Sequence, residues 1–214
     1  MDLVSIFQAV QQVMESHRLD FNQADEHNHN HGDHMVDIFR IASQAAMDNS
    51  HDDLSADELS TVIGNAASIL RQESENGSAQ VYADGLASLA AQIRKYQIRL
   101  PDLVAYTKGA LTDGKDKPVL KTTVPSRDVL KALVAALAGW QHSDRDNPVR
   151  LVDLGYMFDL GISYMQAKQR GGTRAEVLAD AAASVSPLSR VPYRYESGKF
   201  ALGALLKSLA AQAY

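Results

Sequence analysis

The most unusual stretch of the chain is a run of ligand-type side chains, ADEHNHNHGDHM, from Ala24 to Met35. It holds four of the seven histidines, together with two aspartates, one glutamate and two asparagines. No apolar residue interrupts the run between Asp25 and His34. Carboxylate oxygens are the ligands that magnesium prefers, whereas neutral imidazole suits zinc, nickel or copper. The composition of this stretch is therefore typical of a metal site.

Spacing allows two other interpretations of the same stretch. His31, Asp33 and His34 fall where a helix is expected to begin, and a helix N-terminus offers free N–H groups and partial positive charge to a phosphate. Alternatively, the stretch is a solvated polar loop in which Asp33 is the N-cap of that helix. No fixed zinc spacing such as HExxH is present, so the residues alone leave the metal site, the phosphate site and the capped loop open.

The elements that must position these side chains are all expected to be helices. Apolar residues recur at helical spacing nearly throughout, no convincing strand is found, and Ser55 and Glu58 form a capping-box pattern. Residues 112–125 and Val191–Phe200 are expected to be loops, the latter an ordinary loop, a lid over the barrel mouth or a partner contact. We expect about eight helices in one all-α domain spanning residues 1–214, with mostly antiparallel neighbours. The expected helices lie near Leu3–Met14, His34–Met47, Ser55–Leu70, Gln80–Lys95, Pro101–Leu111, Ser126–Trp140, Val149–Lys168, Arg174–Ser184 and Phe200–Ala213.

Composition narrows the classes of function. The 214 residues carry a net charge of −5, which argues against a general nucleic-acid surface. Cysteine is absent, so disulfides, thiolate metal sites and thiol catalysis are excluded. No apolar run approaches the roughly 20 residues of a membrane span, and the N-terminus lacks the pattern of a secretion signal. A cytoplasmic location without membrane contact is expected.

Four segments resemble, in order, the nucleotide-binding DhaL-type subunit of bacterial dihydroxyacetone kinases. LDFNQADEHNHNHGDHMVDIFR is similar to the family's aspartate-rich signature, which reads Gly-Asp-Gly-Asp-His-Gly at its centre. Asp33 and His34 match that signature, His31 replaces an aspartate, and Asp37 replaces an asparagine. The remaining three segments are NGSAQVYA with Ser78 and Tyr82, LKTTV with Lys121 and Thr122, and YMQAKQRGGTRAEVL with Arg174.

The resemblance implies a barrel of eight antiparallel helices that binds ADP or ATP and divalent metal at one end. Two magnesium ions would be held at the positions of His31, Asp33 and either Asp25 or Glu26. A histidine at position 31 should weaken magnesium and favour a zinc-like ion. The residues implied to line the nucleotide are His34, Asp37, Ser78, Thr122 and Arg174. Among them, Asp37 adds a negative charge that is unfavourable for binding phosphate.

Three functions compete at this stage. The family's subunit supplies only the nucleotide, so the resemblance implies a separate triose-binding kinase subunit as partner, and a homo-oligomer is left open. A second hypothesis is a non-catalytic relative that binds a metal or another ligand, or regulates, through an altered site. A third is a metal-dependent enzyme of another class, for example a hydrolase, that activates water with the His/Asp stretch. We expect the kinase-subunit-like function because the motif positions still carry polar residues.

Overall fold

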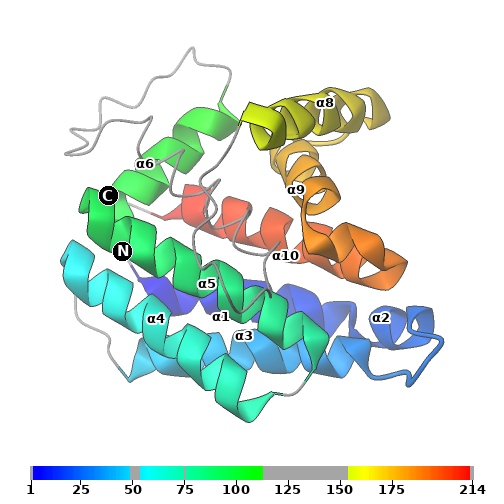
Figure 1. Cartoon of the computed structure of the whole chain (residues 1–214), viewed down its shortest axis with the longest axis horizontal. Coiled ribbons are helices and arrows are strands. Elements are labelled where there is room, and N and C mark those ends of the chain that lie inside the picture. The colour runs from blue at the N-terminus through cyan, green and yellow to red at the C-terminus, as the bar shows by residue number, and fades with distance from the viewer. Residues whose placement is uncertain (1, 49–53, 75, 113–153, 213–214) are drawn as a thin grey trace.

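The computed structural model describes residues 2–48, 54–74, 76–112 and 154–212 (Figure 1). Within these ranges the chain forms nine α-helices, one 3-10 helix and no strand, which confirms the all-α fold class. The elements in chain order are α1 (Leu3–Ser16), α2 (Arg18–Ala24), α3 (His31–Met47), α4 (Ala56–Glu73), α5 (Gly77–Tyr96), α6 (Leu100–Leu111), α8 (Leu154–Arg170), α9 (Arg174–Val185), η1 (Pro187–Arg190) and α10 (Pro192–Ala211).

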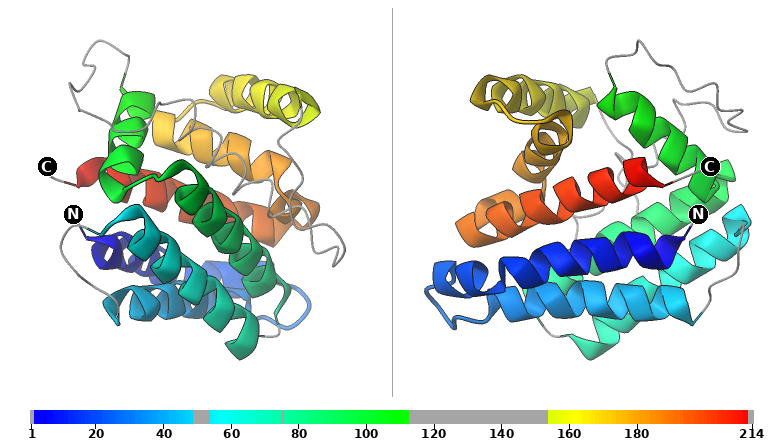
Figure 2. Two further views of the ribbon diagram at one scale, coloured as in Figure 1. Left: turned by 60° about the vertical axis from the view of Figure 1, so that its left-hand side comes forward. Right: turned by 180° about the vertical axis from the view of Figure 1, so that it is seen from behind.

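The helices pack side by side in a bundle. Neighbours follow the order α5, α4, α3, α1, α10, α9 and α8, while α6 packs against α10 (Figures 1 and 2). α2 is a short helix that packs across the start of α3. The expected helix Ser126–Trp140 lies outside the described residues, as does nearly all of the expected loop 112–125.

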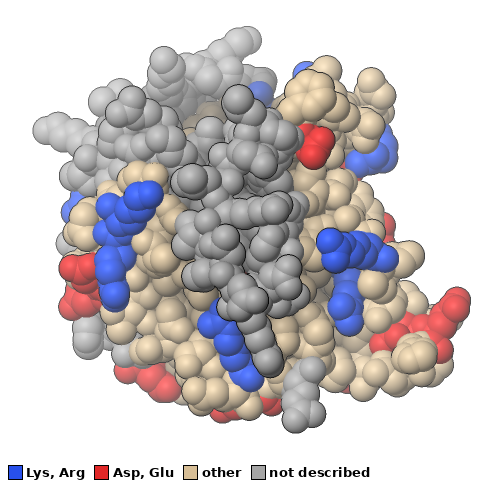
Figure 3. Space-filling model, viewed as in Figure 1, with Lys and Arg blue, Asp and Glu red and all other residues tan. Residues whose placement is uncertain are grey.

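One apolar core lies between the helices. The apolar residues that recur at helical spacing along α1 are buried, and Ile6, Val10 and Met14 are at most 1% exposed. α8 and α9 are joined by a separate small cluster of Ala167, Val177 and Ala181. Among the described residues, no helix is long and apolar enough to cross a membrane. On the face shown in Figure 3, acidic and basic side chains lie in small separate groups.

The capping box predicted for α4 is confirmed. Ser55 Oγ accepts the backbone N–H of Glu58 at 3.3 Å, and Glu58 Oε2 accepts the backbone N–H of Ser55 at 2.8 Å. This reciprocal pair satisfies two N–H groups that a helix start leaves without intrahelical partners.

The structure differs from the expected local structure in three places, and two of the differences bear on the site. α3 begins at His31 with Asn30 in the cap position, so Asp33 is not its N-cap. α10 begins at Pro192, so most of the stretch expected to be a loop is helical. Proline suits the first helical position because it has no N–H to leave unbonded. The third is the short helix α2, which the apolar pattern did not predict.

Candidate functional site

His31 lies inside the protein rather than in a solvated loop. It is 3% exposed, and its Nε2 lies 2.8 Å from the hydroxyl Oγ of Ser197 on α10. Its ring packs against Tyr193 at 4.7 Å and Phe21 at 6.3 Å between centroids. Burial, helped by the nearby charge of Arg194, lowers the pKa of His31 to about 4. The neutral imidazole is therefore a link between α3 and α10.

Asp33 faces a different neighbour, because residues two apart on a helix point to nearly opposite sides. One carboxylate oxygen accepts from Arg18 Nη1 at 2.9 Å and the other from Asn22 Nδ2 at 3.0 Å. These two hydrogen bonds hold the pKa of Asp33 below its usual value. His31 and Asp33, both predicted metal ligands, are thus not brought together.

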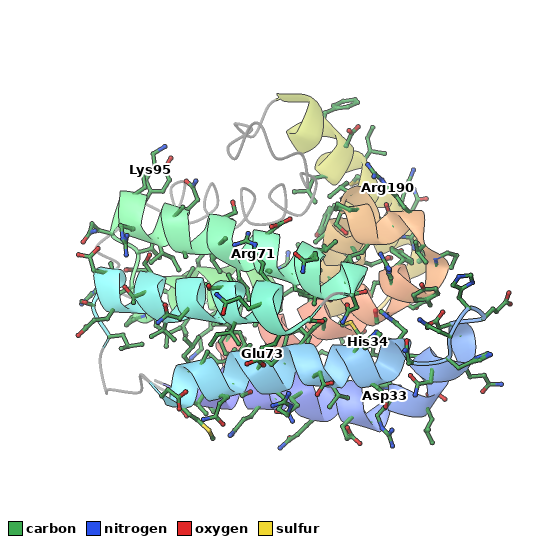
Figure 4. The ribbon with its side chains drawn as sticks, turned by 60° about the horizontal axis from the view of Figure 1, so that its bottom comes forward. Asp33, His34, Arg71, Glu73, Lys95 and Arg190 are labelled. Atoms are coloured by element: carbon green, nitrogen blue, oxygen red, sulfur yellow. The ribbon has the colours of Figure 1, made fainter. Side chains whose placement is uncertain are left out.

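The amide groups at the start of α3 are already bonded within the protein. Asn22 Oδ1 accepts the N–H of Gly32 at 2.7 Å and that of Asp33 at 3.2 Å. The next amide, of His34, donates to the carbonyl of Asn30 at 3.1 Å. The start of α3, marked by Asp33 and His34 in Figure 4, is therefore capped by α2 rather than offered to a phosphate.

The glycine of this stretch has a packing role. A Cβ atom at Gly32 would lie 2.0 Å from the carbonyl oxygen of Arg18, which no side chain tolerates. Because the obstacle is backbone, the first turn of α3 can approach the start of α2 only if residue 32 is glycine. The resemblance places this glycine in a metal and phosphate loop, whereas the structure uses it to bring two helices together.

Asp25 and Glu26, the two alternatives for one of the implied metal positions, differ sharply in burial. Asp25 is 3% exposed, and its Oδ1 accepts the backbone N–H of His27 at 3.2 Å. Asp25 also acts electrostatically on His31, whereas Glu26 is exposed. Of the two, Asp25 therefore lies closer to His31. His27 and His29 are exposed, so only His31 of the alternating histidines points inward.

The remaining acidic candidate, Asp37, lies on the outer face of α3. Its Oδ1 accepts a hydrogen bond from Arg40 Nε at 3.1 Å, and both side chains are exposed. Asp37 is therefore directed to solvent and not to His31.

These donors do not form the two-magnesium site that the resemblance implies. That site needs several anionic oxygens converging on one point, but Asp33 binds Arg18 and Asn22, while His31 binds Ser197. In the part of the chain that the structure describes, no three His, Cys, Asp or Glu side chains gather in a way that could hold a metal ion. Asp25 and His31 supply one carboxylate and one imidazole on the same side.

The start of α5 offers hydrogen-bond donors that the start of α3 does not. Asn76 Oδ1 accepts the N–H of Ala79 at 2.8 Å, and its carbonyl accepts that of Gln80 at 3.3 Å. The N–H groups of Gly77 and Ser78 have no acceptor among the described residues. Ser78, the predicted nucleotide contact, is 2% exposed and lies in this first turn.

Arg194, the third residue of α10, lies against this helix start. A Cβ atom placed on Gly77 would be 3.1 Å from its Nη2 and 3.2 Å from its Nη1. Its Nε is fully enclosed and has no hydrogen-bond partner, and no ion pair of Arg194 is found among the described residues. Its guanidinium also lies 5.9 Å from the centre of the Tyr193 ring. Asn30 Oδ1, next to His31 in the chain, is also enclosed without a partner.

A positive charge is unfavourable in these surroundings. Helix N-termini carry partial positive charge, and Arg194 stands in the first turn of α10 and against the first turn of α5. Figure 4 shows α5 beginning between the start of α3, marked by His34, and η1, marked by Arg190. Three features therefore lie together: a guanidinium with no acidic partner among the described residues, two N–H groups with no acceptor among them, and Ser78. This group is named here the α5 anion site.

Comparison of the chain with protein-family models, with curated proteins and with solved structures found no match in any of the three. The geometry of the α5 anion site is therefore the main support for a function.

Another predicted nucleotide contact, Arg174, does not join this site. Arg174, the first residue of α9, donates from Nη1 to the carbonyl of Thr112. The nearby Glu176 bonds Lys207 at 2.9 Å, and Lys207 is about 20 Å from Arg194 along α10. Arg174 therefore lies toward the other end of the bundle. Thr122 lies outside the described residues.

Ser197 and His31 could also be considered as a nucleophile and base. Ser197 is 1% exposed, and its hydroxyl donates to the carbonyl of Arg194 at 3.1 Å. A histidine whose pKa is about 4 is a weak base at neutral pH, and within the described residues no carboxylate bonds its other ring nitrogen. Enclosure and weak basicity favour a structural role for this pair.

Sequence reasoning did not single out Arg194 or Ser197 as site residues. Both lie in VPYRYESGKF, where two tyrosines and two basic residues stand close together. Recognising Pro192 as a first helical residue would have placed Arg194 in a helix's first turn, where a cation is unusual.

Proposed function

We propose that this protein binds a phosphorylated ligand at the α5 anion site, with a nucleotide such as ADP or ATP as the first candidate. The observation that carries the proposal is the guanidinium of Arg194, which has no acidic partner among the described residues and lies on Gly77. Arginine binds phosphate through two parallel N–H donors, and the free amides of a helix start add further donors.

The resemblance to DhaL-type subunits also favours a ligand site at the end of the protein that holds the α5 anion site. Ser78 is matched to a serine of the family that lines the nucleotide, and it lies in the first turn of α5. His31, matched to a metal position, is close enough to Arg194 for the two charges to interact. Two predicted positions thus fall beside one arginine that the resemblance did not include.

The geometry supports a binding protein over a kinase subunit. Phosphoryl transfer depends on metal ions placed against the transferred phosphate, and the carboxylate of Asp33 is bound to Arg18 and Asn22 instead. Action with a triose-binding subunit remains the second candidate, because it is what the resemblance implies. Release of ADP from ATP with magnesium and such a subunit would favour that candidate.

Calorimetric titration with ADP tests the proposal. The unaltered protein should bind ADP, and Arg194→Gln should weaken binding at least about tenfold, since a charge-assisted hydrogen bond contributes about 1.5–3 kcal/mol. Arg190→Gln is the matched control, because Arg190 is an exposed arginine on the neighbouring η1. Equal affinity for all three proteins, or no binding of ADP or ATP, would contradict the proposal.

A further inference from the structure

The charge needed to bind a phosphate is already present in the α5 anion site. Arg194 supplies a full positive charge, and the first turn of α5 adds the partial charge and N–H groups of Gly77 and Ser78. In metal-dependent phosphate sites this charge comes instead from a cation that bridges protein carboxylates and phosphate oxygens. Two such sources of charge at one place would repel each other.

Most of the acidic groups that the resemblance assigns to this site, all of them in the described part of the chain, are committed elsewhere. Both carboxylate oxygens of Asp33 accept hydrogen bonds from the α1–α2 side, and Asp37 pairs with Arg40 on the outer face. Glu26 is exposed. The buried carboxylate of Asp25 remains, but one carboxylate is too few for a magnesium ion facing a polyphosphate.

We propose that the protein binds the phosphate groups of its ligand without a divalent metal, Arg194 and the amides of Gly77 and Ser78 taking the place of the cation. This inference rests on the proposed function and specifies the form of the ligand. The form bound is the free phosphate or diphosphate anion, whereas a magnesium-dependent site would bind the magnesium complex. Guanidinium and backbone N–H groups donate directly to phosphate oxygens, so no bridging ion is required.

The test is calorimetric titration of the unaltered protein with ADP, once in excess EDTA and once in excess magnesium. We expect affinity in EDTA to equal or exceed that in magnesium, because magnesium neutralises the phosphates that Arg194 binds. Arg194→Gln should lose at least about tenfold in EDTA, and Arg194→Lys should keep part of the affinity. Adenosine and inorganic phosphate, titrated separately, show whether the phosphate alone is recognised.

The outcomes separate the two proposals. Binding that needs magnesium would overturn metal independence and leave the proposed function standing. Absence of binding under both conditions would overturn the proposed function itself. Binding in EDTA that Arg194→Gln leaves unchanged, with the variant melting at the same temperature as the unaltered protein, would place the ligand elsewhere and overturn both. The EDTA arm uses the unaltered protein, so it decides the inference even if a variant fails to fold.

Discussion

The imidazole Nε2 of His31 lies 2.8 Å from Ser197 Oγ, and so joins two residues 166 positions apart in the sequence. The contact ties the first turn of α3 to α10 just beside Arg194, three residues before Ser197. It makes the histidine of the polar stretch part of the packed interior, with consequences for stability that can be measured.

Stability should fall as His31 becomes protonated. The folded-state pKa of about 4 lies below the ordinary value of 6.5, so the unfolded chain binds the proton more readily. The free energy of unfolding should therefore be highest above pH 6.5 and fall between pH 6.5 and 4, by about 2 kcal/mol from pH 7 to pH 5. Urea unfolding of the unaltered protein and of His31→Gln at both pH values measures this difference.

The His31→Gln variant separates the contribution of His31 to the pH dependence of stability from the contributions of other titrating groups. Glutamine retains a hydrogen-bonding group for Ser197 but takes up no proton, so its stability should change less between pH 7 and pH 5. Acidic groups whose pKa is lowered, such as Asp33, titrate alike in both proteins. The same pH slope in the two proteins would show that His31 is not a buried neutral group.

Gly32→Ala should destabilise the protein by about 2 kcal/mol or more, since its Cβ would meet backbone at the start of α2. Gly161→Ala is the control, because its Cβ would meet no atom within 4 Å. In that open helical position alanine should stabilise by about 1 kcal/mol. Thermal melting of the two variants compares them, and equal melting temperatures would refute the close approach of α2 and α3.

The variant Asp33→Asn distinguishes nucleotide binding through a metal ion held by Asp33 from nucleotide binding at the α5 anion site. If Asp33 were a metal ligand for a nucleotide, loss of its charge should abolish binding. Since its carboxylate is instead paired with Arg18 at a half-exposed position, we expect ADP affinity to change less than about threefold and stability by less than about 1 kcal/mol. A large loss of affinity in calorimetry would restore the ligand set implied by the resemblance.

Asp180, on α9, joins three helices. It accepts hydrogen bonds from Arg170 Nε at 2.9 Å and from the hydroxyl of Tyr195, linking α9 to α8 and α10. Asp180→Asn should cost about 2 kcal/mol of unfolding free energy, because charged hydrogen bonds are lost in a mostly buried place. Asp159→Asn, on an exposed face of α8, should be neutral in the same urea titration.

Local pattern predicted the helices well and the site poorly, for one physical reason. The apolar stripe of α1 and the capping box at Ser55 depend on residues within a few positions, so the sequence shows them directly. The burial of His31 depends on Ser197, far away in the chain, and a polar run gave no sign of it. Arg194 was hidden because its first-turn position became visible only once α10 was seen to begin at Pro192.

Amide chemical-shift mapping by NMR shows directly whether phosphate groups bind at the α5 anion site. ADP is titrated into the isotope-labelled protein, and shifts of backbone amides and of arginine Nε–H groups are followed. We expect the largest shifts at Gly77 and Ser78 and at the Nε–H of Arg194. Shifts centred on Arg174 and Thr112, or none at saturating ADP, would contradict it.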